Sequence, residues 1–116
     1  MAVAALAVVG LLAACGGGTV AQPAGSVKVT QTEYKFDPGA ISVPSGSATF
    51  YLVNVGTVSH NMTIVDSAGN QVASSDVVSP GSALVFTATL KAGSYTFYCN
   101  QDDHKGLGMV GTLTVT

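Results

Sequence analysis

Histidine, cysteine and methionine are scarce in this 116-residue chain, and the few that are present are spaced as metal ligands would be. The two histidines are His60 and His104, and Cys99 and Met109 lie five residues before and five residues after His104. Two imidazoles, one thiolate and a thioether suit a copper ion that alternates between Cu(II) and Cu(I), because soft sulfur favours Cu(I) while nitrogen accepts both states. The sequence therefore predicts one copper ion bound by His60, Cys99, His104 and Met109.

The other methionines and the nearby glycines agree with this prediction. Met1 belongs to an apolar N-terminal segment, and Met62 lies in an apolar strand pattern where a core position is the simpler interpretation. Gly106 and Gly108, which follow His104, allow the backbone to curl around an ion.

The first 14 residues differ from the rest of the chain and consist almost entirely of alanine, valine and leucine. This run is shorter than the roughly 20 apolar residues that span a bilayer. It ends in Leu12-Ala13-Ala14-Cys15, and small residues before a cysteine resemble the site where bacterial signal peptidases cut lipoproteins. We expect residues 1–14 to be a lipoprotein signal and Cys15 to carry the lipid, although no lysine or arginine opens the segment. The alternative is a buried apolar helix with an incidental cysteine.

Residues 15–25 follow as the lipidated cysteine and an uncharged linker of glycine, alanine, proline, threonine and glutamine. About ten such residues have an r.m.s. span of about 17 Å and reach at most about 35 Å. This tether predicts a protein exported to the cell envelope and held by lipid on the periplasmic or extracellular face of a membrane.

Cys99 needs a chemical role, because it is the only thiol left once Cys15 carries lipid. An exported protein rarely keeps a lone free cysteine without such a role. Metal ligation supplies one. The alternative is a disulfide between Cys15 and Cys99, which is less favoured because Cys15 lies in the targeting segment.

Composition bounds the remaining possibilities. Residues 26–116 are enough for one domain. Only 9% of residues are charged, none is arginine, and the formal net charge is −2, so the chain has no basic face for nucleic acid.

From residue 26 onward, short runs rich in valine, threonine and aromatic residues alternate with glycine, proline and asparagine, and no stretch has a helical period. This pattern predicts an all-β sandwich of about eight strands in two sheets. The expected strands are Val27–Glu33, Ala40–Val43, Ala48–Val55, His60–Asp66, Asn70–Ser74, Ala83–Leu90, Ser94–Cys99 and Val110–Thr116.

Side chains two positions apart in a strand share a face, and this alternation places the ligands. Cys99 shares the inward face of its strand with Phe97, and His60 begins an apolar strand. Met109 directly precedes another strand. If the strand that ends at Cys99 runs antiparallel to the other two, all three residues lie at one end of the sandwich, and the loop after Cys99 brings His104 there too.

Two stretches of sequence resemble the cupredoxins, the blue-copper proteins, of the plastocyanin and halocyanin kind. One is Gly93-Ser94-Tyr95-Thr96-Phe97-Tyr98-Cys99, followed by His104 and by Gly108-Met109-Val110-Gly111-Thr112-Leu113-Thr114-Val115. The other comprises Phe36-Asp37-Pro38, the segment from Val43 to Gly46, and the segment from Asn54 through Gly56 to His60-Asn61. The resemblance covers residues 27–116 and implies an eight-stranded Greek-key sandwich with copper at one end. It also implies a monomer that transfers one electron between redox protein partners and is not an enzyme.

The resemblance implies a role for each ligand. His60 is similar to the buried imidazole ligand, and Cys99 to the thiolate that dominates electronic coupling. His104 is similar to the ligand at the solvent edge, through which electrons pass, and Met109 to the weak axial ligand.

Residues next to the ligands have expected roles too. Asn61 would brace the two ligand loops, and Tyr98 resembles an aromatic residue that some relatives use as a second electron route, although plain surface packing is the simpler interpretation. Asp102 and Asp103 depart from the family, where proline or glycine usually precedes this histidine. They could favour imidazolium on reduction, attract cationic partners, compete as oxygen ligands, or be ordinary solvated turn residues.

Three functions compete on the sequence. Electron transfer is favoured, because four protein ligands leave copper no open position for a substrate. A copper carrier or scavenger of the cell envelope is the alternative, although the chain has no Met-rich or His-rich tract. A metal-free adhesion module would leave the ligand spacing unexplained.

Overall fold

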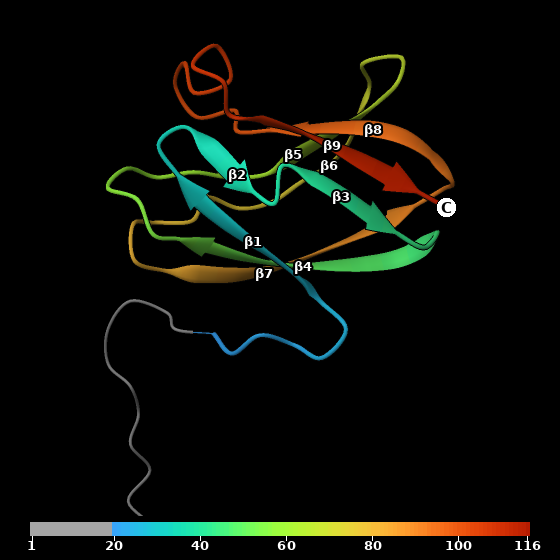
Figure 1. Cartoon of the computed structure of the whole chain (residues 1–116), viewed down its shortest axis with the longest axis horizontal. Helices are drawn as coiled ribbons and strands as arrows, with labels where there is room; N and C mark the ends of the chain where they lie inside the picture. The colour runs from blue at the N-terminus through green and yellow to red at the C-terminus, as the bar shows by residue number, and fades with distance from the viewer. Residues whose placement is uncertain (1–19) are drawn as a thin grey trace, which may run out of the picture.

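The computed structural model describes residues 20–116, which form two packed β-sheets with nine strands (Figure 1). The predicted all-β sandwich is confirmed. The signal segment 1–14 and Cys15 lie outside the described residues. The strands are β1 (Val27–Thr32), β2 (Lys35–Asp37), β3 (Ala40–Val43), β4 (Gly46–Asn54), β5 (Thr63–Asp66), β6 (Gln71–Ser74), β7 (Ala83–Leu90), β8 (Gly93–Tyr98) and β9 (Val110–Val115).

One sheet has the strand order β2-β1-β4-β7 and the other β3-β9-β8-β5-β6. The pairs β1–β4 and β3–β9 are parallel, and the other pairs are antiparallel. The chain passes repeatedly from one sheet to the other, as it does between β4 and β5 and between β7 and β8 (Figure 1). Strands that are neighbours in a sheet are therefore often distant in sequence, which is Greek-key connectivity.

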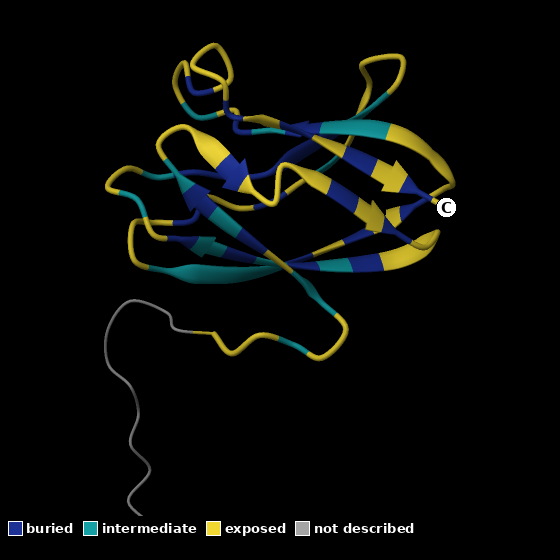
Figure 2. Ribbon diagram, in the orientation of Figure 1, coloured by how far each residue is buried: buried dark blue, intermediate teal, exposed yellow. Residues whose placement is uncertain are grey.

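The core lies between the two sheets, and buried residues alternate with more exposed ones along β3, β4, β9 and the second half of β7 (Figure 2). In β9, for example, positions 111, 113 and 115 are buried while 110, 112 and 114 are exposed. Two aromatic pairs reinforce the packing: Phe36 meets Phe97 edge to face at 4.9 Å, and Phe50 stacks on Phe86 at 5.9 Å.

Two strand predictions need correction. The strand β2 was not expected, because only Phe36 of its three residues is buried and so short a segment has no visible alternation. The expected strand His60–Asp66 begins three residues late, at Thr63. The residues from 60 to 64 are all buried, so no apolar–polar alternation marks where the strand begins. Before Thr63, only His60 forms a bridge, with Val78.

Part of the expected linker lies against the domain. Tyr51, on the outer face of β4, donates a hydrogen bond to the Val20 carbonyl, and Ser26 donates through its hydroxyl to the Pro23 carbonyl at 2.6 Å. Within residues 20–116, no helix is long and apolar enough to cross a membrane.

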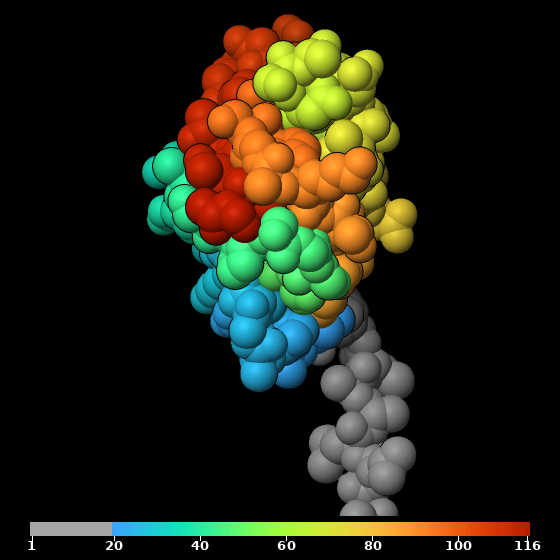
Figure 3. Space-filling view, turned by 90° about the vertical axis from the view of Figure 1, so that its right-hand side faces the viewer, coloured from blue at the N-terminus to red at the C-terminus, as the bar shows by residue number. Residues whose placement is uncertain are grey.

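The two ends of the sandwich differ. At the end seen in Figure 3, the turn between β3 and β4 lies beside the C terminus, where the Ser45 amide donates to the Thr116 carbonyl at 2.8 Å. The opposite end holds the loop between β8 and β9. Because β8 is antiparallel to both β5 and β9, the end of β8 and the starts of its two neighbours meet there. This is the strand arrangement that brings the expected ligands to one end of the sandwich.

Gly111 permits the closest contact in this part of the core. A Cβ atom at this position would collide with the Phe97 ring and would lie 2.7 Å from the Gly39 carbonyl oxygen. The backbone of β9 therefore packs directly against the neighbouring ring because residue 111 has no side chain.

We expect Gly111→Ala to lower the free energy of unfolding by about 1–3 kcal/mol, since the core must shift to admit the methyl group. Urea unfolding measures the change. Gly39→Ala is the matched control, because its Cβ would make only an ordinary 3.6 Å contact with the Phe36 carbonyl. Equal stability of the two variants would contradict the packing argument.

Candidate metal centre

Backbone hydrogen bonds close the loop that follows β8. The Cys99 amide donates to the Met109 carbonyl at 3.2 Å, so the two ends of the loop stay paired. The Met109 amide in turn donates to the His104 carbonyl at 3.1 Å. Gly108 has a φ of 103°, which an L side chain rarely adopts, and this allows the chain to turn back into β9. The three expected ligands of this loop are therefore held together by the main chain.

His60 comes from a separate part of the chain and is held by another pair of hydrogen bonds. Its amide donates to the Val78 carbonyl at 3.1 Å, and the Val78 amide donates to the His60 carbonyl at 2.7 Å. The side-chain amide of Asn54 also donates to the Val78 carbonyl, at 2.9 Å. These contacts position His60 beneath the loop.

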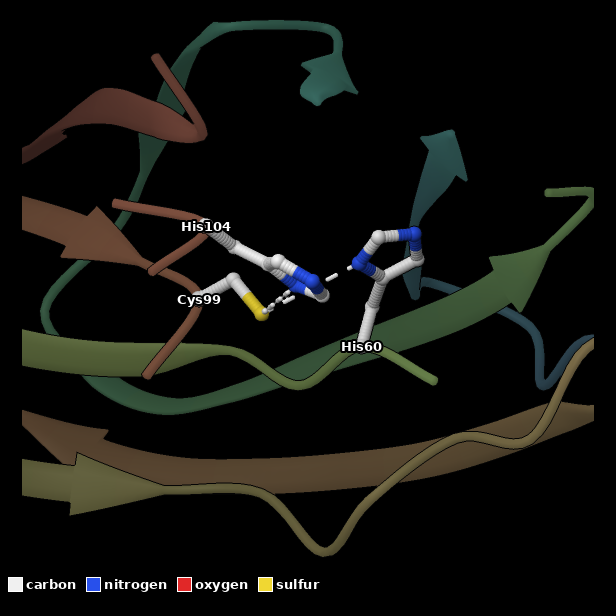
Figure 4. Close-up of side chains that lie close together, drawn as sticks. All are labelled: His60, Cys99 and His104. Carbon is white, nitrogen blue, oxygen red and sulfur yellow. Dashed lines mark hydrogen bonds between the residues drawn. The ribbon is translucent and has the colours of Figure 1, made fainter. Parts of the chain in front are cut away.

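The side chains of His60, Cys99 and His104 converge at this end of the sandwich (Figure 4). The Cys99 sulfur lies 3.4 Å from His104 Nδ1 and 3.9 Å from His60 Nδ1, and one ligand atom of each residue lies within 4.8 Å of the others. Cys99 is a free thiol. Both Cys99 and His60 are 0% exposed, and His104 is 5% exposed.

The geometry of these side chains fits one metal ion. Sulfur and imidazole ligands bind transition metals at about 2.3 and 2.0–2.1 Å, so a sulfur and a nitrogen on one ion are at most about 4.4 Å apart. Both sulfur–nitrogen distances, 3.4 and 3.9 Å, satisfy that limit. Two nitrogens and one soft sulfur suit copper. These three residues would hold the ion, and the bound copper would supply a one-electron Cu(II)/Cu(I) couple.

Met109 is fully buried and directly precedes β9. Its main chain is bonded to the two residues nearest it in the cluster, through the Cys99 amide and the His104 carbonyl. Met109 is therefore held next to Cys99 and His104 by the main chain, and its thioether is the candidate for a fourth ligand.

The two residues expected to support the ligands differ in their surroundings. Asn61 is buried, and its side-chain oxygen accepts a hydrogen bond of 2.9 Å from the Asn100 amide, which joins the His60 segment to the loop after Cys99. Tyr98 is half-buried on the face of β8 opposite Cys99, and the Lys105 ammonium lies 4.4 Å from the centre of its ring.

Asp102 and Asp103 are exposed, and neither joins the cluster of potential ligands within residues 20–116. Asp102 has a φ of 42°, a conformation that asparagine and aspartate tolerate better than most residues. The geometry favours the turn interpretation of these acids over oxygen ligation.

Sequence reasoning missed two residues that contact the histidines. Tyr34 packs against the His104 ring, with the ring centres 4.9 Å apart. Glu33 places its Oε1 atom 3.2 Å from His60 Nε2. No motif marks either residue, because both lie more than 20 positions from the histidines in sequence and reach them only through the fold.

Hydrogen bonding and burial change the acidity of Glu33 and His60. Hydrogen bonds from the Val58 and Thr57 amides, helped by His60, lower the pKa of Glu33 to about 2. Glu33 is therefore a carboxylate at neutral pH. Burial lowers the pKa of His60, and the hydrogen bond to Glu33 opposes part of this lowering.

Comparisons with known proteins agree with this site. A model of the family described as "Copper binding proteins, plastocyanin/azurin family" matches residues 23–116. Plastocyanin of Mercurialis perennis is 37% identical over 92 residues, which cover 72% of this chain and 89% of that protein.

Solved structures add the fold. Plastocyanin of the fern Dryopteris crassirhizoma superposes with a TM-score of 0.61 at 33% identity, covering 78% of this chain and 100% of that one. Reduced auracyanin of Roseiflexus castenholzii has a TM-score of 0.70 at 23% identity, with coverage of 87% and 99%. With the converging ligands and the family match together, the chain belongs to the plastocyanin/azurin family of copper-binding proteins.

Proposed function

We propose that this protein is a one-electron carrier in which His60, Cys99, His104 and Met109 bind a single copper ion. The observation that carries the proposal is the convergence of one thiol and two imidazoles, all buried, at one end of a rigid sandwich. Proteins similar to this chain include plastocyanin and auracyanin, which are electron-transfer proteins.

The surroundings of the ligands suit electron transfer better than catalysis. Cys99 and His60 are fully buried, and a substrate would need an open coordination position next to solvent. Ligands positioned in advance by the fold also let both oxidation states of copper share one geometry, so little rearrangement accompanies each transfer.

The two histidines differ in their access to a partner. The outer nitrogen of His60 is hydrogen-bonded to Glu33. The His104 side chain is 5% exposed, and its ring packs against that of Tyr34. His104 is therefore the proposed exit for electrons. Leu107, which is 55% exposed, and Tyr34, which is 36% exposed, provide an apolar margin for a docked redox protein.

The same burial argues against the copper carrier or scavenger. A protein that hands over its metal must let the recipient's ligands approach the ion. Here the thiol and one imidazole have no exposed surface, so release would require the loop after Cys99 to open.

We also propose that Cys15 carries a lipid that anchors the protein to a membrane of the cell envelope, after removal of residues 1–14. Support comes from the Leu12-Ala13-Ala14-Cys15 motif. Val20, whose carbonyl accepts a hydrogen bond from Tyr51, is five positions after Cys15, and five residues span at most about 18 Å. The outer face of the four-stranded sheet would then lie near the membrane.

Replacing the thiolate tests the copper assignment. Addition of Cu(II) to the wild-type protein should give an intense blue thiolate-to-copper absorption and a reversible one-electron wave. Cys99→Ser should lose the colour, because a hydroxyl cannot replace the soft thiolate. Colour that persists without Cys99, or a colourless wild-type protein, would contradict the proposal.

Replacing the thioether tests the fourth ligand. Met109→Leu should retain copper and colour but shift the reduction potential measured by voltammetry, because the weak axial ligand tunes the potential. Met62→Leu is the matched control, since Met62 is equally buried and a Leu–Met exchange usually costs less than about 1.5 kcal/mol. Equal potentials in both variants would exclude Met109 as a ligand.

Replacing Cys15 tests the anchor. In a bacterial host, Cys15→Ser should move the protein from the membrane fraction to the soluble fraction, because no acyl chain can be attached. Immunoblotting of the fractions, with mass spectrometry of the mature N terminus, gives the result. An unmodified Cys15 in the mature wild-type protein would refute lipidation.

A further inference from the structure

One carboxylate is bonded to the side of His60 that faces away from Cys99. Glu33 lies just after β1, and its Oε1 atom is 3.2 Å from His60 Nε2. The other ring nitrogen, Nδ1, is directed at the Cys99 sulfur, 3.9 Å away. The two nitrogens of this imidazole therefore have separate partners on opposite sides of the ring.

The Glu33 carboxylate is held in place by several hydrogen bonds. The same Oε1 atom accepts hydrogen bonds from the Thr57 amide at 2.8 Å and the Val58 amide at 3.0 Å. Gly56 makes room for it, because a Cβ at that position would lie 2.7 Å from Glu33 Oε2. The Glu33 side chain is 27% exposed, while His60 is fully buried, so the carboxylate keeps contact with solvent at the edge of a buried site.

We propose that Glu33 is a positioning residue for the copper ion. It holds the His60 proton on Nε2 and so leaves Nδ1 free to bind copper. It also places a negative charge on the far side of the His60 ring from the copper. The proposal rests on the copper-binding function proposed above. An ionised carboxylate can only accept hydrogen bonds, so the proton between Glu33 and His60 must belong to the ring. Orientation of a ligating histidine through its second nitrogen is a general feature of metal sites.

The charge of Glu33 has its own consequence. A nearby negative charge stabilises Cu(II) relative to Cu(I), and so lowers the reduction potential. The exposed acids of the His104 loop act through solvent, which screens them more strongly. The two histidines therefore have different roles. Glu33 fixes the orientation of His60 and lowers the reduction potential of the copper, whereas His104 faces the redox partner.

Three substitutions distinguish the effect of Glu33 on the orientation of His60 from the effect of its negative charge. Glu33→Ala removes both, and Glu33→Gln removes the charge while its amide oxygen still accepts from His60. Gly56→Ala keeps the charge but displaces the carboxylate. Asp76→Asn is the control for loss of a negative charge, because Asp76 is an exposed carboxylate on the segment between β6 and β7.

The first measurement needs no metal. Imidazole ¹⁵N NMR of the copper-free protein should show His60 as a single Nε2–H tautomer in the wild type and in Glu33→Gln, and a mixture in Glu33→Ala and Gly56→Ala. The second is titration with Cu(II) alone, in which Glu33→Ala should bind about 10- to 100-fold more weakly. The third is voltammetry, in which Glu33→Gln should shift the Cu(II)/Cu(I) ratio about tenfold toward Cu(I), or about 59 mV upward.

The proposal would be overturned if Glu33→Ala kept the wild-type tautomer and copper affinity, or if Glu33→Gln moved the potential no more than Asp76→Asn. Because Glu33→Gln preserves the shape of the side chain, it tests the charge even if Glu33→Ala does not fold. Failure of the copper function would instead appear as a wild-type protein that does not bind Cu(II), and the tautomer measurement would still report on Glu33.

Discussion

The antiparallel pairing of β8 with both β5 and β9 is the constraint on which the metal centre depends. It brings Cys99, at the end of β8, to the same end of the sandwich as the residues that precede β5 and β9. The ladder continues past the strand itself, because the Cys99 amide bonds to the Met109 carbonyl and keeps the ends of the ligand loop together. The sheet therefore supplies the rigidity, and the loop only has to carry His104 back over the sulfur. Loss of this pairing would separate the ligands, whatever their identities.

The site combines soft ligands with an almost complete exclusion of water. Burial lowers the pKa of His60 and so favours the neutral imidazole that a metal requires. The cost of burying polar groups is reduced because the ligands face one another and the outer nitrogen of His60 is bonded to Glu33. The other histidine, His104, is 5% exposed, and its ring packs against that of Tyr34. The proposed electron carrier would use both features, a protected ion and one ligand close to the surface.

Short-range sequence patterns predict most of the strands. Alternation of apolar and polar residues predicts the long strands β4, β7 and β9 to within about two residues at each end, as is usual for element boundaries. The same signal fails at β2, which has a single buried residue, and at His60, where five consecutive buried residues hide the point at which β5 begins. The two failures differ in kind: at β2 a strand forms that no alternation marks, whereas residues 60–62 lie outside the strand that was expected there.

The sequence by itself determined the ligand types, because two histidines, one cysteine after the first 19 residues and the spacing around His104 leave few other sets. It also determined that the domain is a β-sandwich, since period-two alternation is a local property of the chain. Only the tertiary structure decided which nitrogen of His60 faces Cys99, and that Glu33 and Tyr34 contact the two rings. Those relations join residues 27 or more positions apart, for example Glu33 and His60, and they arise from the packing of the two sheets, which no short pattern encodes.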